Sequence, residues 1–396
     1  MRLLKTGTEV ELSVYIKQAE SILKKENIYI LESTDHAVHA AAYIAWRNVG
    51  GNILVLPPLV ESIKIQVKTE LAKILPTLFN SVVFLTSGTT GSPKLVIHTY
   101  KQFDQALKMS SAVFNWGTSE RILILVPAFV VGYWLMALPC ATYTNSTLVI
   151  TGVDTICDDI VQPGDQLLGA SGHYELLRYR KTLSDYSLFS KILLGGSHPT
   201  INLYNYIFSH GGRSVTNAYG STEIGVPILS REVTSSDSNY NHLGMLSNLG
   251  AEFKLMNGEL YVKSESVCSN YRDYPHDDEW FGTQDIWELS PDSGLIRFTG
   301  RSNDIVKVNG YRCNLLQLEV FMEENTNLGE CLAVVRKSMG VEWIEILYTN
   351  SSTQIDRQAL IKLCTLNLDK NCIPKKYTFT EHILKTAMKK KIRTLQ

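Results

Sequence analysis

The stretch that decides the fold is "SVVFLTSGTTGSPK", residues 81–94. It opens with five residues that suit a buried strand, from Val82 to Thr86, and continues with small hydroxyl and glycine residues. Glycine has no Cβ, so the backbone N–H groups of such a run are open to close approach. Together with the hydroxyl donors and the charge of Lys94, the run predicts a loop that wraps an anionic phosphate chain. A flexible surface turn is the alternative.

The spacing of the glycines excludes the most common phosphate-binding loop. That loop requires G-x-x-x-x-G-K-[ST]. Here Gly88 and Gly91 are three residues apart, and Pro-Lys-Leu follows. An ordinary P-loop ATPase is therefore excluded.

The residues around this loop alternate between helix and strand patterns. Asp35 precedes an alanine-rich helical pattern as an N-cap, and Gly50 follows it as a stop. Strand patterns at 52–58 and 81–88 flank an amphipathic helix pattern at 61–75. Further short apolar runs end in glycine at 147–152, 191–196 and 214–220. The alternation predicts an α/β fold with mostly parallel strands.

The pattern changes after Thr234. A polar run leads into an alternating segment with Asn257-Gly258 at its centre, which is the strongest short signal for a β-hairpin. From about Asn303 a fresh set of strand and helix patterns begins. We predict a large N-terminal α/β domain with a β-rich subdomain, residues 1–300, and a small C-terminal α+β domain, residues 303–396.

The composition is that of an ordinary globular protein, with 44% hydrophobic and 19% charged residues in a chain of 396. Its net charge of −1 lacks the basic balance that is typical of nucleic-acid-binding proteins. The seven cysteines contain no C-x-x-C pair. Their number and spacing disfavour a disulfide framework or a zinc site and favour a reducing, cytoplasmic compartment.

One charge-free run, residues 122–143, is long enough to span a bilayer. It also contains Pro127, Gly132 and Pro139, and a buried strand, a loop and a buried helix explain it as well. We expect no membrane span, because one isolated span would split the core of an α/β domain. The N-terminus has no continuous apolar region and no small-residue cleavage site, so we also expect no signal peptide.

The glycine-rich loop resembles the signature of the adenylate-forming superfamily, which comprises acyl- and aryl-CoA ligases, luciferases and the adenylation domains of peptide synthetases. Later segments resemble the other motifs of this family in the family's order: "NAYGSTEIG" (217–225), "WFGTQDIWEL" (280–289), "GLIRFTGRSNDIVKVNGYRCNLLQLE" (294–319) and "KTAMKKKIR" (385–393). The chain departs from the usual glycine at Leu95, Gln284 and Lys389, and from the usual Asp or Lys of the hinge at Asn303. It is also compact, because its loop begins as early as Thr86.

The resemblance implies a two-step reaction. A carboxylate attacks the α-phosphorus of ATP, which yields an acyl-adenylate and pyrophosphate, and a thiol then displaces AMP. The implied cofactors are ATP and Mg²⁺, and the implied acceptor is coenzyme A or the phosphopantetheine of an acyl carrier protein.

The resemblance also implies where ATP binds. The residues expected to grip the β- and γ-phosphates are Thr86, Ser87, Gly88, Thr89, Thr90, Gly91 and Lys94. Tyr219 is expected to stack on adenine, opposite the segment Gly195, Gly196, Ser197 and His198. Ala218, Gly220 and Ser221 complete the motif around Tyr219.

The resemblance assigns the chemistry to three residues. Glu223 would bind Mg²⁺, which prefers carboxylate oxygens together with phosphate and water. Thr222 would donate to the α-phosphate. Lys390 would bridge the attacking carboxylate and the α-phosphate, although the adjacent Lys389 and Lys391 leave this choice open.

Four residues are expected to act from the C-terminal half. Asp285 would accept hydrogen bonds from the ribose hydroxyls. Arg301 would reach the ribose or a phosphate. Lys307 and Gly310 lie in the segment that turns inward for thioester formation in the family, which implies that the small domain is mobile.

Two other functions stay open from the sequence. The four departures fit a non-catalytic nucleotide-binding protein, and an adenylate-forming enzyme could also pass its acyl group to an amine. The acid itself is not identified. His98 and His173 could line its pocket, but isolated histidines are more often structural.

Overall fold

The computed structural model describes residues 1–5, 7–24, 28–59, 61–87, 93–114, 117–118, 120–237, 240, 242–245, 250–270, 276–308, 311–338, 341–350, 356–368, 370–385 and 391. The chain divides into two compact units. The first comprises Met1–Pro199, Leu203–Lys254 and Tyr261–Thr283, and the second comprises Thr200–Asn202, Leu255–Leu260 and Gln284–Gln396. The expected hinge residue, Asn303, thus lies within the second unit, and the domain boundary at 301–303 stays a prediction.

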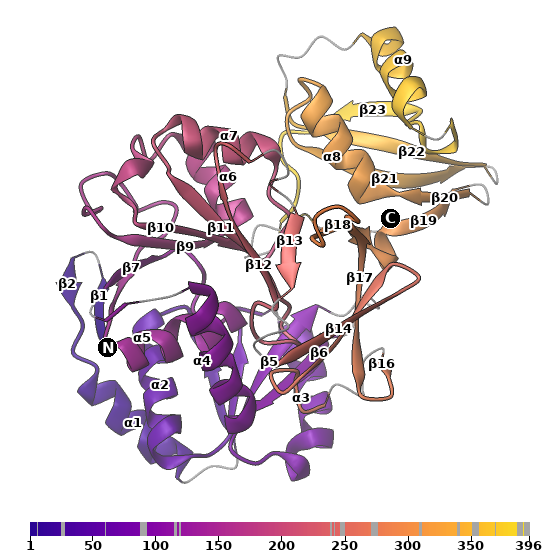
Figure 1. Ribbon diagram of the computed structural model, residues 1–396. Coiled ribbons are helices and arrows are strands. Elements are labelled where there is room, and N and C mark those ends of the chain that lie inside the picture. The colour runs from indigo at the N-terminus through magenta and orange to yellow at the C-terminus, as the bar shows by residue number, and fades with distance from the viewer. Residues whose placement is uncertain are drawn as a thin grey trace. The chain divides into compact units, whose positions relative to one another are not determined.

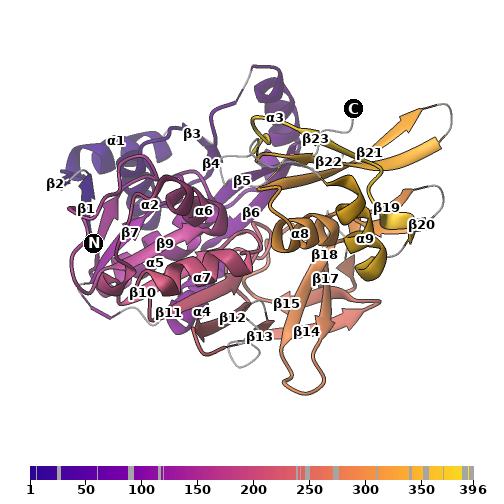
Figure 2. The same ribbon diagram turned by 90° about the horizontal axis from the view of Figure 1, so that it is seen from above.

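Four strands form the smaller sheet of the first unit, in the order β3-β4-β5-β6 (Figure 2). They are β3 (Tyr29–Glu32), β4 (Ile53–Leu56), β5 (Ser81–Ser87) and β6 (Pro93–Thr99). The first three run parallel, as the α/β pattern predicted, whereas β6 runs antiparallel to β5. The sequence analysis did not predict β6.

The outer edge of β6 is covered by two side-by-side residues from a later loop. The side chain of Asn270 accepts the N–H of Ile97 at 3.0 Å and donates to the carbonyl of Leu95 at 2.9 Å. The backbone N–H of Ser269 donates to the carbonyl of Ile97 at 2.8 Å. Backbone groups that another strand would pair are therefore already satisfied.

The larger sheet of the first unit has the order β13-β12-β11-β10-β9-β7-β8-β1-β2. Its strands are β1 (Arg2–Lys5), β2 (Thr8–Glu9), β7 (Arg121–Ile124), β8 (Thr147–Ile150), β9 (Gln166–Ala170), β10 (Lys191–Gly195), β11 (Ser214–Tyr219), β12 (Leu229–Thr234) and β13 (His242–Met245). The strands from β11 to β1 are parallel, and antiparallel strands lie at both ends. This sheet confirms the predicted α/β class.

The helices of the first unit connect these strands and cover the sheets (Figure 1). They are α1 (Ser13–Leu23), α2 (His36–Val49), α3 (Glu61–Ile74), α4 (Tyr100–Phe114), α5 (Leu138–Thr144), α6 (Ser171–Arg180) and most of α7 (Ile201–Ser209). The predicted caps of α2 are confirmed. The Asp35 side chain accepts the N–H of Ala37 at 2.8 Å, and Gly50 ends the helix with a φ of 75°.

The charge-free run at 122–143 folds as a buried strand, a loop and a buried helix, as predicted. It comprises β7 with its following loop, a π-helical turn (Gly132–Ala137) and α5. Tyr133, Trp134 and Leu135 are completely buried within the unit. Among the described residues, no helix combines the length and the apolar character that crossing a bilayer requires.

A β-rich segment follows and contains the predicted hairpin. Its strands are β14 (Ala251–Met256), β15 (Glu259–Ser264), β16 (His276–Asp277), β17 (Trp280–Leu289) and β18 (Ile296–Arg301). Asn257 and Gly258 connect β14 to β15 with φ values of 52° and 82°. Positive φ at both turn residues is the geometry that Asn-Gly favours.

The rest of the second unit is an α+β structure. It contains β19 (Ile305–Val308), β20 (Tyr311–Asn314), α8 (Leu315–Asn325), β21 (Cys331–Ser338), β22 (Val341–Tyr348), α9 (Arg357–Asn367) and β23 (Lys376–Phe379). Figure 1 shows α8 and α9 beside the three-stranded sheet β21-β22-β23. The core between them includes Leu318, Met322, Ala333, Ile346 and Cys364. Asp356 caps the last helix by accepting the N–H groups of Gln358 and Ala359.

Candidate functional site

The ends of the signature loop lie on paired strands. Thr86 on β5 is the antiparallel partner of Lys94 on β6, and Ser87 is the partner of Pro93. Gly88, Thr89, Thr90 and Gly91 lie outside the described residues, so their grip on phosphate stays a prediction. The pairing nevertheless places the predicted cation, Lys94, directly across from the first threonine of the loop.

Two further predicted segments meet at the carboxyl ends of parallel strands. Leu194 of β10 is the partner of Asn217 of β11, so that Gly195 lies beside Ala218. A Cβ on Gly195 would come within 3.2 Å of the carbonyl oxygen of Ala218. The segment Gly195, Gly196 and Ser197 is thus adjacent to the segment that begins with Ala218 and Tyr219. In open α/β sheets, ligands bind in this position, outside the carboxyl ends of the strands.

The turn after β11 contains both predicted catalytic residues of the first unit. Gly220 is required there, because a Cβ would lie 2.3 Å from the carbonyl oxygen of Val226. The N–H of Gly225 donates to the carbonyl of Ser221 at 2.8 Å and closes the turn around Thr222 and Glu223. Both of these side chains are half-buried, and each can reach a ligand.

Two hydrogen bonds fix the backbone of this turn. The carbonyl of Thr222 is 2.8 Å from Nε2 of His98 on β6. The carbonyl of Glu223 accepts the N–H of Cys268 at 2.7 Å. The strand that returns from the signature loop is therefore joined directly to the turn that holds Glu223.

Sequence reasoning set His98 aside, and the structure gives it a contact with the site. Its side chain is 0% exposed. Burial lowers its pKa to about 4, although the hydrogen bond to Thr222 opposes this shift. The signal in the sequence was a single histidine directly after three apolar residues, four positions after Lys94 of the signature. His173, by contrast, accepts the N–H of Ala170 at 3.1 Å at the start of α6.

A Mg²⁺ site at Glu223 needs little from the protein. The described residues contain no group of three or more His, Cys, Asp or Glu side chains that could hold a metal ion. Magnesium bound to a nucleotide takes most of its ligands from phosphate and water, so that one carboxylate is enough. The fixed backbone and half-buried side chain of Glu223 fit this role.

Asp285 and Arg301 belong to the second unit and are paired with each other. They are cross-strand partners on β17 and β18, and Nε of Arg301 lies 2.7 Å from Oδ1 of Asp285. The carboxylate is buried, whereas the Arg301 side chain is 48% exposed. Gln284, which replaces the usual glycine of the motif, has a φ of 59° in the left-handed region. The expected contacts of Asp285 and Arg301 with ribose stay a prediction.

The remaining predicted residues of the second unit are only partly described. Lys307 is exposed on β19. Asn303 lies in a short 3₁₀ turn (Ser302–Asp304), and its side chain is not described. Gly310 lies outside the described residues. The roles of these residues in thioester formation stay predictions.

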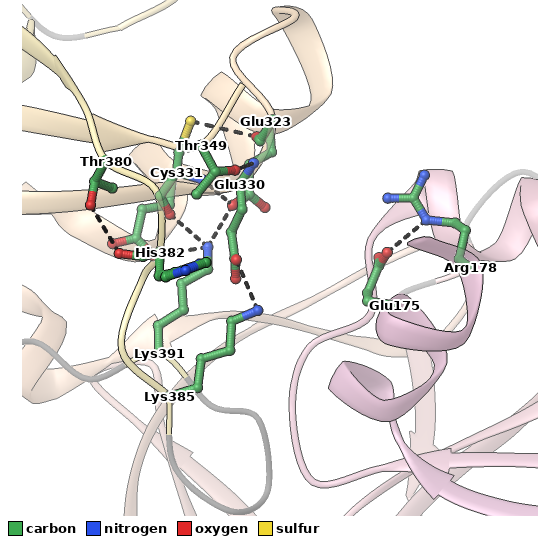
Figure 3. A network of polar contacts seen from close by, with 12 residues as sticks. Glu175, Arg178, Glu323, Glu330, Cys331, Thr349, Thr380, His382, Lys385 and Lys391 are labelled. Carbon is green, nitrogen blue, oxygen red and sulfur yellow. Dashed lines mark hydrogen bonds and ion pairs between the residues drawn. The ribbon is translucent and has the colours of Figure 1, made fainter. Parts of the chain in front are cut away.

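Lys390 and Lys389 also lie outside the described residues, but the third lysine of the run is well defined. Nζ of Lys391 lies 2.5 Å from Glu323, 3.7 Å from Glu319 and 2.7 Å from the carbonyl of Cys331 (Figure 3). Burial alone would lower the pKa of Lys391, but attraction to the two carboxylates outweighs it and raises the pKa above its usual value. Lys391 is thus committed within the second unit and is not a solvated tail residue.

A second ion pair lies next to it. Nζ of Lys385 is 2.8 Å from Glu330, and Lys385 forms an isolated β-bridge with Lys391. We call Lys385, Lys391, Glu319, Glu323 and Glu330 the lysine cluster. Glu323 and Glu319 of α8 also accept backbone N–H groups of β21, from Cys331 and Ala333 respectively, each at 2.8 Å. The cluster therefore connects Lys385 and Lys391, the two described lysines of the last motif (385–393, the closing motif), to α8, β21 and Glu330.

Comparisons with known proteins show similarity to AMP-binding enzymes over part of the chain. The family model described as "AMP-binding enzyme" matches residues 78–272. Malonate–CoA ligase of Arabidopsis thaliana is 23% identical over an alignment that covers 97% of this chain and 72% of the relative. Surfactin synthase subunit 1 of Bacillus subtilis is 24% identical over 64% of this chain and 8% of the much longer relative.

Solved structures show the same fold. The o-succinylbenzoate CoA synthetase of Bacillus subtilis, in complex with its acyl-adenylate intermediate, superimposes with a TM-score of 0.78 at 18% identity, over 98% of this chain and 93% of that chain. The same synthetase with ATP and magnesium ion gives a TM-score of 0.77 at 19% identity, over 98% and 94% of the two chains.

Proposed function

We propose that the chain is an adenylate-forming enzyme, which uses ATP to activate a carboxylic acid and then transfers the acyl group to a thiol. One observation carries the proposal. The strand that returns from the signature loop, the Thr222–Glu223 turn and the carboxyl ends of β10 and β11 form one connected group within the first unit. This group brings together the predicted phosphate, adenine and metal contacts.

The proposed chemistry has two balanced steps. A carboxylate oxygen of the acid bonds to the α-phosphorus of ATP, the bond from that phosphorus to the bridging oxygen breaks, and pyrophosphate leaves. The sulfur of the thiol then bonds to the acyl carbon, the mixed anhydride breaks, AMP leaves with the electron pair, and the thiol proton passes to solvent. Both steps depend mainly on holding two anions together and neutralising the charge that develops between them.

Each residue supports one part of this reaction. The signature loop, Thr86 and Lys94 would hold the outer phosphates, and Thr222 would donate to the α-phosphate. Glu223 would hold Mg²⁺, which neutralises phosphate charge when it is bound. Lys390 would stabilise the charge on the pentacovalent phosphorus, and Asp285 with Arg301 would bind ribose.

The acceptor is either coenzyme A or a carrier-protein phosphopantetheine. Both kinds of protein occur among the relatives, as a CoA ligase and as a peptide synthetase subunit. Assays with coenzyme A and with phosphopantetheinylated carrier proteins separate the two acceptors. We place the reaction in the cytoplasm, because all seven cysteines are free thiols.

ATP–pyrophosphate exchange across a panel of carboxylic acids tests the first step. We expect exchange with at least one acid, and a loss of about a hundredfold in Glu223→Gln, since that variant weakens the charge neutralisation on which the step depends. Glu252→Gln is the control, because Glu252 is an exposed glutamate of the same unit. Absence of exchange with every acid of the panel would contradict the proposal.

One of the departures from the family pattern has a structural explanation. Leu95 is buried and packs in a core cluster with Leu54 and Val83. It therefore does not favour a non-catalytic nucleotide-binding protein. ATP binding without pyrophosphate release would favour that alternative, and mass spectrometry of the products would detect transfer to an amine.

A further inference from the structure

His98 lies between the strands that flank the signature loop, β5 and β6, and the turn that contains Thr222 and Glu223. Its ring sits in the middle of β6, is 0% exposed and lies close to Phe84 of β5, with ring centroids 6.0 Å apart. On its other side, Nε2 is 2.8 Å from the carbonyl of Thr222. The ring therefore fills the space between the signature strands and the turn that holds Glu223.

The protonation of this ring follows from its surroundings. A pKa of about 4, caused by burial, leaves the imidazole neutral near pH 7. The carbonyl of Thr222 can only accept a hydrogen bond, so Nε2 must carry the single ring proton. Nδ1 is then a bare acceptor. It is buried and makes no hydrogen bond among the described residues, so within that part of the chain the ring is held by its hydrogen bond to Thr222.

Hydrogen bonds fix two successive carbonyls of the turn, and both hydrogen bonds connect the turn to β6, directly or through residues bound to it. His98 holds the carbonyl of Thr222, and Cys268 holds the carbonyl of Glu223. The residues that follow Cys268 are in turn bound to Ile97 on β6. The direction of the Glu223 side chain is therefore set by its main chain, and that main chain is set by one strand.

The packing against Gly225 leaves little tolerance. Gly225 has a φ of 84°, and a Cβ built on it would lie 3.0 Å from Cε1 of His98 and 2.8 Å from the side chain of Leu135. The turn is thus pressed against the imidazole ring. A small shift of the ring moves Thr222 and Glu223 with it.

From this geometry we propose that His98 is a positioning residue, which donates from Nε2 to the Thr222 carbonyl and thereby sets the geometry of the Mg²⁺–ATP site at Thr222 and Glu223. His98 touches neither nucleotide nor acid in this role. The proposal rests on the proposed function and deepens it, since it assigns the support of the metal-binding carboxylate to a residue outside the family motifs.

The chain offers a matched control in His39. It is also 0% exposed, its pKa is also lowered to about 4 by burial, and its Nε2 also lies 2.8 Å from a backbone carbonyl, that of Ser33. Its Nδ1 accepts from the indole of Trp134 at 3.0 Å. Loss of this ring removes the same kind of hydrogen bond, but the carbonyl that loses its donor is that of Ser33 and not that of Thr222.

The experiment measures ATP affinity by calorimetry on the full-length protein, with and without Mg²⁺, for wild type, His98→Leu, His98→Gln and His39→Leu. We expect His98→Leu to weaken Mg²⁺–ATP binding about tenfold and metal-free ATP binding by much less. His98→Gln keeps an N–H donor and should stay within about threefold of wild type. His39→Leu should lower the melting temperature without changing the Mg²⁺ dependence.

The outcomes are separable. Wild-type protein that fails to bind Mg²⁺–ATP overturns the proposed function and this inference with it. Wild-type binding with an unchanged His98→Leu, or with His98→Gln as weak as His98→Leu, overturns the inference alone. If His98→Leu does not fold, Gly225→Ala decides the matter, because its added methyl group would press on Leu135 and on the His98 ring, and unchanged Mg²⁺–ATP binding in that variant overturns the inference.

Discussion

The Thr222–Glu223 turn and the lysine cluster hold their functional segments by different means. In the first unit, the turn is held by neutral hydrogen bonds from His98 and Cys268 to backbone carbonyls. In the second unit, the closing motif is held by two lysines among three glutamates. The first arrangement fixes the backbone next to Glu223, the proposed metal ligand, and the second fixes Lys391, which follows the proposed catalytic Lys390 in the sequence.

The two regions differ in the charge of the groups that hold each segment. Neutral donors near Glu223 leave the net charge of the site to its ligands, so that Mg²⁺ can neutralise it. The lysine cluster confines the charge of Lys391 within the second unit, which leaves Lys390 and Lys389 as the candidates for catalysis. The four predictions that follow test this contrast.

The largest effect is expected for Lys390→Ala. Under the role proposed for Lys390, loss of its ammonium group should lower ATP–pyrophosphate exchange by about a hundredfold to a thousandfold. The melting temperature should stay the same. Exchange close to the wild-type rate would move the catalytic role to Lys389.

A smaller effect, on stability instead of rate, is expected for Lys391→Met. The change leaves Glu323 and the almost fully buried Glu319 without their cation, which should lower the free energy of unfolding by about 2 to 3 kcal/mol. Lys337→Met is the control, because its ion pair with Glu342 is long and its side chain is 66% exposed. Urea unfolding of both variants measures the difference. Equal stability would show that the lysine cluster is not a structural support.

The charge-based packing of the second unit predicts a pH dependence. Burial opposes ionisation of Glu345, but hydrogen bonds from Thr378, Arg336 and Lys376 outweigh it and hold its pKa at about 2. A pKa lowered on folding adds stability that is present above about pH 4.5 and is lost as the pH falls towards 2. Wild type should lose roughly 2 kcal/mol of unfolding free energy over this range that Glu345→Gln does not lose. Parallel pH curves for the two proteins would contradict this assignment.

The smallest effect is expected for Gln284→Gly. A left-handed φ costs a residue with a Cβ about 1 kcal/mol or more, and the greater freedom of glycine in the unfolded chain returns part of this. A net gain of about 0.5 kcal/mol in the free energy of unfolding is expected, with no change in the ion pair of Asp285 and Arg301. A loss of stability would mean that the Gln284 side chain contributes more than its backbone strain costs.

Local signals in the sequence predicted much of the fold. The helix caps at Asp35 and Gly50 and the turn at Asn257-Gly258 depend on short-range geometry, and the structure confirms them. Residues 93–99 were not predicted as a strand, because a proline and a lysine open them and their strand conformation depends on the pairing with β5.

The site was predictable only in part for the same reason. The motif order predicted Tyr219, Thr222 and Glu223, and the parallel strands bring Ala218, which precedes Tyr219, beside Gly195. The support from His98 is a contact across 124 positions in the chain, which no local pattern encodes. The burial of Lys391 likewise depends on glutamates of a distant helix, whereas a run of three lysines usually indicates solvent exposure.

The cover on β6 has a consequence for the behaviour of the protein in a crowded solution. An uncovered strand at the margin of a sheet is a template on which another molecule can add its own strand, and such additions start aggregates. The carboxamide of Asn270 occupies the hydrogen-bonding positions of Leu95 and Ile97 that such an intruder would need. Two neutral residues, Ser269 and Asn270, thus protect β6 from self-association without adding a charge next to the signature loop.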